Sequence, residues 1–111
     1  MEDGWEVAGT KRSKIDSANV FLFDGYGPVE QTSALKRTTH LLSSVPPSGG
    51  KDPVLQCNLS ELSALGDLEW VGYLSATSVY GDTSGEWVDE SCTPNPGTKR
   101  GIDRLSAENQ W

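Results

Sequence analysis

The chain has 111 residues, which is enough for one modest hydrophobic core but too few for a cofactor domain and a separate substrate domain. Sixteen acidic and nine basic residues give a net charge of −7, which disfavours nucleic acid as a partner because its phosphate backbone is polyanionic. No stretch approaches the ~18 apolar residues that cross a bilayer, and the amino terminus shows no signal-peptide pattern. We therefore expect a soluble intracellular protein, cytoplasmic or organellar, with no membrane partner.

Short apolar runs predict four strands. The runs are rich in Val, Phe, Leu and Tyr, and each ends at small or polar turn residues. They are nearly continuous rather than alternating, which is typical of strands covered on both faces in a parallel sheet. The four predicted strands are residues 5–8, 20–23, 40–45 and 70–74, the last continuing to Val79-Tyr80.

The strongest predicted helix spans Asp52 to Leu65. Its leucines recur at spacings of four, three and three, which places them on one helical face. Asp52 and Pro53 have the types expected for the N-cap and first turn, and Gly66 is expected to end the helix. We expect a weaker helix over Glu30–Lys36. The leucines of the first helix are Leu55, Leu59, Leu62 and Leu65.

A last helix is predicted over Thr98–Trp111, where Ile102 and Leu105 are spaced about one turn apart. Strands that alternate with helices indicate βαβ units and a parallel sheet, so the expected class is a single α/β domain over residues 1–111. The acidic segment 78–97 is predicted to form a loop after the fourth strand. In open α/β sheets, ligands bind at this carboxyl edge.

Metal binding is not expected from the sequence. Cys57 and Cys92 lie far apart without a CxxC pattern, and His40 is the single histidine. Reduced structural thiols are therefore expected rather than a zinc site or a disulfide framework.

Several segments resemble one family of nucleotide-dependent enzymes. The run from Tyr73 to Asp82, followed by Glu90 and Pro94, resembles the fifth strand and next loop of extended short-chain dehydrogenases, the NAD(P)-dependent epimerase/dehydratase proteins. An atypical branch of that superfamily is similar over nearly the whole chain, most specifically from His40 to Glu90. The resemblance implies a partial Rossmann-like parallel sheet, containing the second to fifth strands with flanking helices. The segments that carry the closer likeness are residues 39–47, 52–55, 70–75 and 100–101.

This resemblance implies a site for NADP or NAD. Arg12 matches the basic residue that grips the adenosine 2′-phosphate, and Thr10 ends the strand before it. Asp24 matches the acid that contacts adenine, while Ser44 to Pro46 match the wall beside the pyrophosphate. Simpler interpretations stay open: Arg12 as a solvated turn residue, Asp24 as a turn former, and the Pro46-Pro47 pair as a strand stop.

The sequence also departs from the family pattern. The family begins with a strand and a G-x-G-x-x-G loop that holds the pyrophosphate, whereas this sequence starts at the expected second strand. The catalytic Ser/Thr, Tyr and Lys positions fall on Ala76, Arg100 and Arg104, and an arginine stays protonated at neutral pH. Ser75, Thr77 and Tyr80 are the weak remaining candidates for a catalytic role.

The first strand of the family lies between the second and fourth strands of the sheet. Without it, either those two strands pair directly or two unpaired edges remain, and open edges invite association. We therefore expect a weakly stable or self-associating chain.

Two classes of function are expected. One is a truncated epimerase/dehydratase-like protein, incomplete at both ends, with weak or no catalysis alone. The alternative is a non-catalytic interaction module that recruits a partner through the acidic loop after Tyr80 or through open sheet edges. A hydrolase using His40 is disfavoured because the sequence has no G-x-S-x-G motif.

Overall fold

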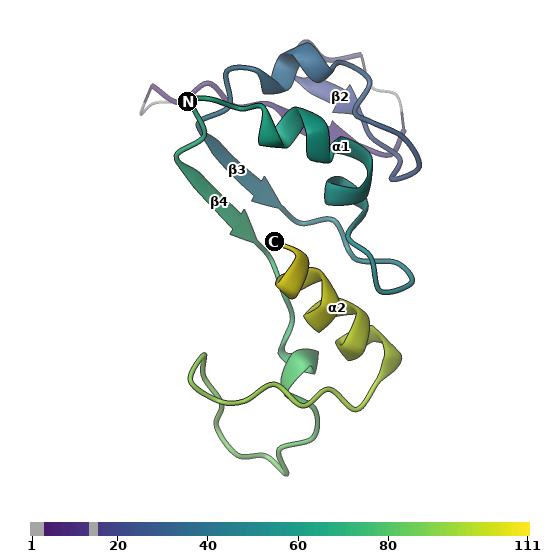
Figure 1. The fold of residues 1–111 in the computed structure, drawn as a ribbon, viewed down its shortest axis with the longest axis vertical. Coiled ribbons are helices and arrows are strands. Elements are labelled where there is room, and N and C mark those ends of the chain that lie inside the picture. Colours follow the sequence, from purple (N-terminus) through teal and green to yellow (C-terminus); the bar gives the residue numbers. More distant parts are fainter. Residues whose placement is uncertain (1–3, 14–15) are drawn as a thin grey trace.

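The computed structural model describes residues 4–13 and 16–111 (Figure 1). From the second strand to the fourth, strands alternate with helices, in agreement with the predicted α/β class. No helix within the described ranges is both long and apolar enough to cross a membrane. The elements are β1 (Gly9–Lys11), β2 (Val20–Leu22), the 3₁₀ helix η1 (Thr32–Leu35), β3 (His40–Ser43), α1 (Pro53–Ser63), β4 (Trp70–Tyr73), the 3₁₀ helix η2 (Thr77–Tyr80) and α2 (Lys99–Gln110).

The strands form two separate parallel pairs. β1 pairs with β2, with Thr10 opposite Phe21, and β3 pairs with β4, with Leu42 opposite Gly72. In the part of the chain that the structure describes, no ladder joins one pair to the other. The family's second and fourth strands correspond to the first and third predicted strands of this sequence, and the structure does not show the alternative in which those two pair directly.

Two strand predictions need correction. The first strand is Gly9–Lys11 rather than residues 5–8, and residues 77–80 form η2 rather than an extension of β4. The apolar side chains of residues 5–8 do not mark a strand. The Trp5 ring instead packs edge-on against the His40 ring, with ring centroids 4.7 Å apart. Trp5 thus packs through its side chain, while backbone pairing begins at Gly9, whose N–H donates to the Asn19 carbonyl at 2.9 Å.

Helix α1 begins as predicted and ends early. The Asp52 carboxylate accepts from the Leu55 N–H at 3.0 Å, and Pro53 is the first helical residue. The helix stops at Ser63 with Ala64 as its cap, so the prediction that Gly66 ends it is wrong: the Ala64 N–H closes the last turn on carbonyls of residues 60–62. A kink at Asn58, with φ −131°, turns the predicted leucine stripe, leaving Leu59 58% exposed.

The segment Glu30–Lys36 forms only the short 3₁₀ helix η1. The buried side chain of Asn58 in α1 holds the chain just before this segment. Its side-chain oxygen accepts from the Val29 N–H at 2.8 Å, and its amide donates to the Val54 carbonyl at 3.0 Å. Satisfying a buried backbone N–H in this way offsets its desolvation. The same two bonds account for the kink in α1.

Helix α2 matches its prediction in range but not in its apolar face. Thr98 caps it by accepting from the Gly101 N–H at 3.1 Å. Gly101 lies so close to the Ser78 carbonyl that a Cβ there would collide, so α2 packs on η2 through its backbone. Ile102, expected on the apolar face, is instead 55% exposed, while Ala107 is fully buried.

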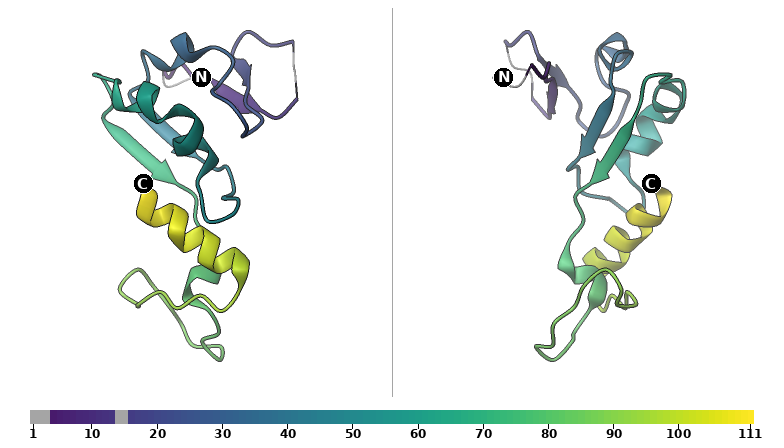
Figure 2. Two further views of the ribbon diagram at one scale, coloured as in Figure 1. Left: turned by 45° about the vertical axis from the view of Figure 1, so that its right-hand side comes forward. Right: turned by 90° about the vertical axis from the view of Figure 1, so that its left-hand side faces the viewer.

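Asp52 ties the start of α1 to the end of α2. Its side chain is fully buried and accepts from Trp111 Nε1 at 3.0 Å, in addition to capping α1. Its own N–H donates to Gln110 Oε1 at 3.0 Å, and the nearby Gly50 carbonyl accepts from Ser106 at 2.8 Å. This network holds the carboxyl-terminal helix beside the loop before α1 (Figure 2).

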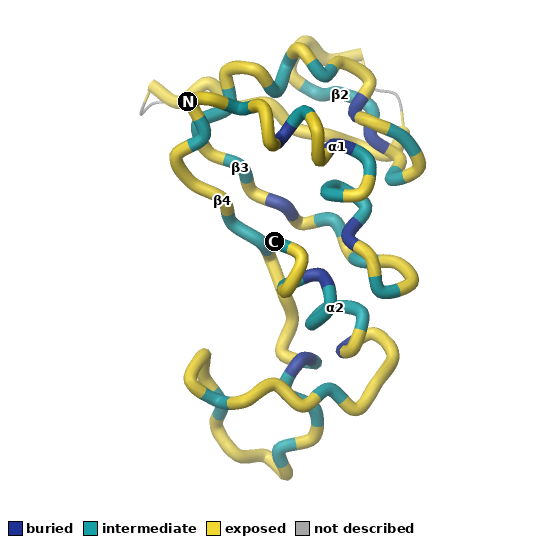
Figure 3. The backbone as a smooth tube through the Cα atoms, viewed as in Figure 1, coloured by how far each residue is buried: buried dark blue, intermediate teal, exposed yellow. Residues whose placement is uncertain are grey.

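The core is small, and the strands are largely exposed. All of β1 is exposed, and Ser43 is the one buried residue of β3 (Figure 3). The prediction of strands covered on both faces is therefore wrong, because two-stranded sheets with few helices cannot cover both faces. The accessible surface is 8179 Å², against about 6,000 Å² for a compact protein of this mass. The buried apolar residues are Phe23, Val29, Leu62, Val79 and Ala107.

The low burial predicts marginal stability. The radius of gyration is 16.0 Å, against about 13 Å for a compact chain of this length. We expect thermal unfolding of the purified chain below ~65 °C, or a transition that shifts with protein concentration. A cooperative, concentration-independent transition well above that temperature would contradict this expectation.

Substitution Asp52→Ala is expected to lower the free energy of unfolding by about 2–4 kcal/mol, because it removes a helix cap and leaves the Trp111 indole N–H without its acceptor. Urea unfolding followed by circular dichroism measures the change. Asp67→Ala, at an exposed acid, is the matched control and should change stability by less than ~0.5 kcal/mol. Equal effects of the two substitutions would show that the Asp52 network is dispensable.

Candidate functional site

A hollow of about 220 Å³ lies where the first three strands end. We call it the strand-end hollow. Each of the three walls comes from the residues at or just after the carboxyl end of one strand, which is the usual ligand-binding edge of parallel α/β sheets. Its lining residues are Thr10 and Lys11 of β1 with Arg12 just after it, Phe23, Asp24 and Gly25 after β2, and Ser44, Val45 and Pro46 after β3.

The structure brings all the predicted cofactor-binding residues together. Thr10 and Arg12 come from β1, Asp24 from β2, and Ser44 and Pro46 from β3, and all five line the strand-end hollow. Their roles toward a nucleotide stay a prediction, whereas their convergence is an observation.

The wall from β2 is built on a tight turn. Phe23 is buried and its N–H donates to the Lys11 carbonyl at 2.9 Å, so β1 and β2 remain joined up to the hollow. Asp24 Oδ1 accepts from the Tyr26 N–H at 2.9 Å, and Gly25 has a φ of +90° between them. Asp24 therefore does act as a turn former, the simpler interpretation from the sequence, and it does so on the rim of the hollow.

The hollow is locally cationic on a strongly anionic chain. The lining residues include two basic side chains, Lys11 and Arg12, and one acidic side chain, Asp24, whereas the whole chain has a net charge of −7. A concave site with one sign of charge raises the local concentration of ligands of opposite sign. The strand-end hollow thus favours an anion, and Arg12 supplies the planar donor group that suits phosphate.

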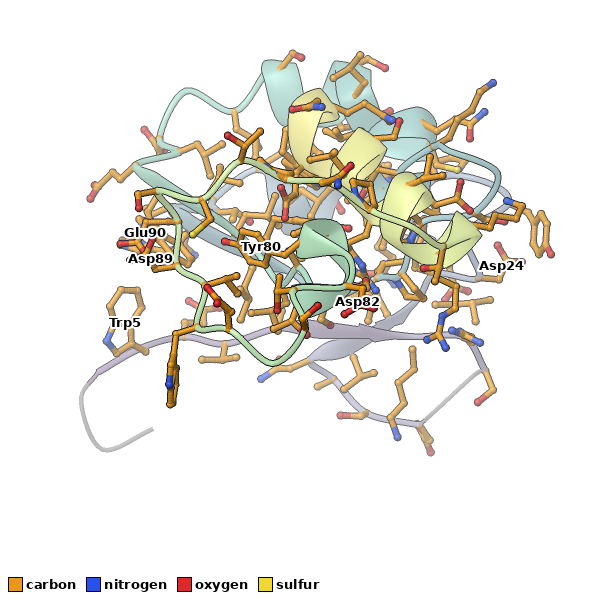
Figure 4. All side chains as sticks on the ribbon, turned by 90° about the horizontal axis from the view of Figure 1, so that it is seen from below. Trp5, Asp24, Tyr80, Asp82, Asp89 and Glu90 are labelled. Carbon is orange, nitrogen blue, oxygen red and sulfur yellow. The ribbon has the colours of Figure 1, made fainter. Side chains whose placement is uncertain are left out.

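The weak catalytic candidates lie elsewhere. Ser75, Thr77 and Tyr80 belong to β4's exit and η2, and none lines the strand-end hollow. Figure 4 shows Tyr80 and Asp24 well apart across the molecule. Loss of solvent around the phenol, and then the neighbouring Cys92 and Glu108, raise the pKa of Tyr80. A raised pKa keeps the phenol protonated, which is unfavourable for a general base.

Arg104 has a packing role. Its Nη1 donates to the Tyr73 hydroxyl at 3.1 Å and to the Leu74 carbonyl at 3.1 Å, which holds α2 to the end of β4. Arg100 is exposed at the start of α2. Arg100 and Arg104, which the resemblance aligns with the Tyr and Lys positions of the dehydrogenases, are therefore not among the residues that line the strand-end hollow.

Sequence reasoning missed a second, more open hollow. It has a volume of about 480 Å³ and lies beside the amino ends of β3 and β4. Its charges are mixed, and no motif in the sequence marks it. Within residues 4–13 and 16–111, no three His, Cys, Asp or Glu side chains converge as metal ligands. The residues around the second hollow are Arg37, Thr39, Gly66, Asp67, Leu68 and Glu69.

Phe23 and Gly25 are lining residues that sequence reasoning also missed. Each of them neighbours a residue that was predicted. The signal that could have found them is the strand end itself, since in parallel sheets every residue there approaches the same edge.

Comparison with solved structures finds a protein of similar sequence and fold. The chain is similar to a conserved protein of unknown function from Silicibacter pomeroyi DSS, with 38% sequence identity and a TM-score of 0.83. The match covers 99% of this chain and 41% of that chain, so this sequence spans about two fifths of the solved protein's length. No protein-family model matches the sequence. No curated protein matches it either.

The turn that shapes the hollow is testable by substitution. Gly25→Ala should lower the free energy of unfolding by about 1–2 kcal/mol, because a φ of +90° is unfavourable for a residue with a Cβ. The nearest atom to such a Cβ, Pro53 Cβ at 3.6 Å, is at ordinary contact distance, so the cost is conformational rather than steric. Gly27→Ala is the matched control, since Gly27 has no positive φ and no close neighbour. Urea unfolding that shows the same stability for the Gly25→Ala and Gly27→Ala variants would refute this account.

Proposed function

We propose that the chain is a nucleotide-binding domain of Rossmann-like type, similar to part of an NAD(P)-dependent epimerase/dehydratase, whose strand-end hollow takes the adenosine 2′-phosphate half of NADP. The observation that carries the proposal is the convergence of Thr10, Arg12, Asp24, Ser44 and Pro46 around one cationic hollow. Three strand ends supply these residues, so their meeting depends on the parallel arrangement of the sheets.

The size of the hollow supports half a dinucleotide rather than a whole one. Pockets that enclose a complete small ligand usually measure about 300–1,000 Å³, whereas this hollow measures about 220 Å³. In this proposal Arg12 and Lys11 bind the 2′-phosphate, and Asp24 and Pro46 contact the adenosine. Oxidoreductase activity of a longer protein is part of this proposal, while the isolated chain is expected to show weak or no catalysis.

The discriminating experiment is isothermal titration with 2′-AMP and 5′-AMP, followed by NADPH and NADH. Saturable binding of the 2′-phosphorylated members is expected, because charge-assisted hydrogen bonds to phosphate contribute about 1.5–3 kcal/mol. Arg12→Ala should weaken 2′-AMP and NADPH binding by about 10–100-fold and leave NADH unchanged. Arg100→Ala is the matched control at an exposed arginine on α2 and should have no effect.

The nucleotide proposal would be refuted if none of the four nucleotides bound saturably. Equal loss from Arg12→Ala and Arg100→Ala would refute the assignment of Arg12, since it would indicate a response to net charge alone.

A second candidate, a non-catalytic interaction module, is favoured by a different observation. In the residues that the structure describes, β1 and β3 each pair on one side alone. An edge with unpaired N–H and C=O groups is a template for a further strand. The two candidates are compatible, because the unpaired edges and the strand-end hollow use different groups of the same strands.

A further inference from the structure

The second hollow lies at the opposite end of β3 from the strand-end hollow. Thr39, directly before β3, and Glu69, directly before β4, both line it, so it opens at the amino ends of this strand pair, away from α2 (Figure 1). Its volume of about 480 Å³ is within the ~300–1,000 Å³ of pockets that take small molecules. The two hollows share no lining residue, so a ligand in the second is separate from the nucleotide proposed above.

The backbone around the second hollow is held by hydrogen bonds. The Thr39 carbonyl accepts from the Glu69 N–H at 2.7 Å, which joins the chain just before β3 to the chain just before β4. The Thr38 N–H donates to the Leu35 carbonyl at 2.9 Å and closes the turn that contains Arg37. Side chains mounted on an ordered backbone are positioned before a ligand arrives, which lowers the entropic cost of binding.

The charged groups of the second hollow are not paired with one another. One guanidinium, that of Arg37, and two carboxylates, those of Asp67 and Glu69, line it. Within residues 4–13 and 16–111, the one ion pair joins Lys99 to Asp103 on α2. Three charged groups of both signs therefore share one concave surface, and each is available to a ligand.

We propose that the second hollow binds a free basic α-amino acid, the class of lysine and arginine. Such a molecule carries one carboxylate and two cationic groups, which is the inverse of the charge set of the hollow. In this proposal Arg37 binds the α-carboxylate through parallel N–H donors, and Asp67 and Glu69 accept from the α-ammonium and the side-chain cation. Leu68, which is half-buried, contacts the methylene chain between them.

The net charge of the ligand follows from the charges of the site and of the chain. One basic and two acidic lining residues sum to −1, and a basic amino acid has a net charge of +1. The chain as a whole carries −7, so its field attracts this ligand and repels an acidic one. A neutral amino acid leaves one carboxylate of the hollow without a partner. Basic amino acids are therefore expected to bind most tightly, and acidic ones least.

The test titrates the full 111-residue chain with L-lysine and L-arginine at low ionic strength, where exposed ion pairs are least screened. Saturable binding with a Kd of about 0.1–1 mM is expected, which nuclear magnetic resonance measures. The amide signals of Thr39, Gly66 and Glu69 should shift, because these residues line the second hollow. The Gly25 amide, in the strand-end hollow, should not shift.

Three analogues of lysine each lack one of its charged groups. Norleucine lacks the side-chain ammonium, cadaverine lacks the carboxylate, and Nα-acetyl-lysine lacks the α-ammonium. Each should bind at least about tenfold more weakly than lysine, because each leaves a charged group of the hollow without a partner. Equal binding of Nα-acetyl-lysine would overturn the assignment to a free amino acid, since the lysine at the carboxyl end of a peptide offers the same groups.

Arg37→Gln and Lys36→Gln form a matched pair of variants. Both remove one positive charge at neighbouring exposed positions, but only Arg37 lines the second hollow. Arg37→Gln should weaken lysine binding by at least about tenfold and leave cadaverine binding no weaker, since cadaverine has no carboxylate for the guanidinium. Lys36→Gln should change neither.

Three results would overturn the inference: no saturable binding of lysine or arginine, norleucine binding as tightly as lysine, or equal effects of the Arg37→Gln and Lys36→Gln substitutions. The analogue series uses the unaltered chain, so it stays decisive even if a variant fails to fold. Titration with NADPH reports on the strand-end hollow alone, so failure of the nucleotide proposal and failure of this one are distinguishable.

Discussion

The lack of a backbone ladder between β1 and β3 in the described residues is the constraint on which the rest of this structure depends. Each strand satisfies one edge within its own pair, and no ladder in the described part of the chain connects the pairs. The consequences reach both stability and function. The core is divided and the exposed surface is large for the mass, while the carboxyl ends of the strands still converge on one hollow.

What holds the arrangement together is a set of side-chain contacts rather than a continuous sheet. Asn58 joins α1 to Val29, Asp52 joins the start of α1 to Trp111, and Trp5 packs on His40. Two of these contacts satisfy buried polar groups, whose desolvation would otherwise oppose folding. Such contacts fix positions precisely but add little apolar burial, so they specify the fold more than they stabilise it.

Local patterns predicted the elements well where local forces decide them. The cap Asp52, the helix that begins at Pro53, the last helix and the strands near 20, 40 and 70 follow from residue types and spacing. The errors have tertiary causes. Leu59 and Ile102 lie outside the core because Asn58 kinks α1 and because α2 approaches η2 through Gly101, contacts between segments distant in sequence.

The strand-end hollow was predictable for a different reason. Parallel strands deliver their carboxyl ends to one edge, so a correct strand assignment places Arg12, Asp24 and Pro46 together without any knowledge of the turns between them. Lys11 and Arg12 share this edge with a single acid, Asp24, although the whole chain is anionic, because strand direction rather than net charge decides which side chains meet there.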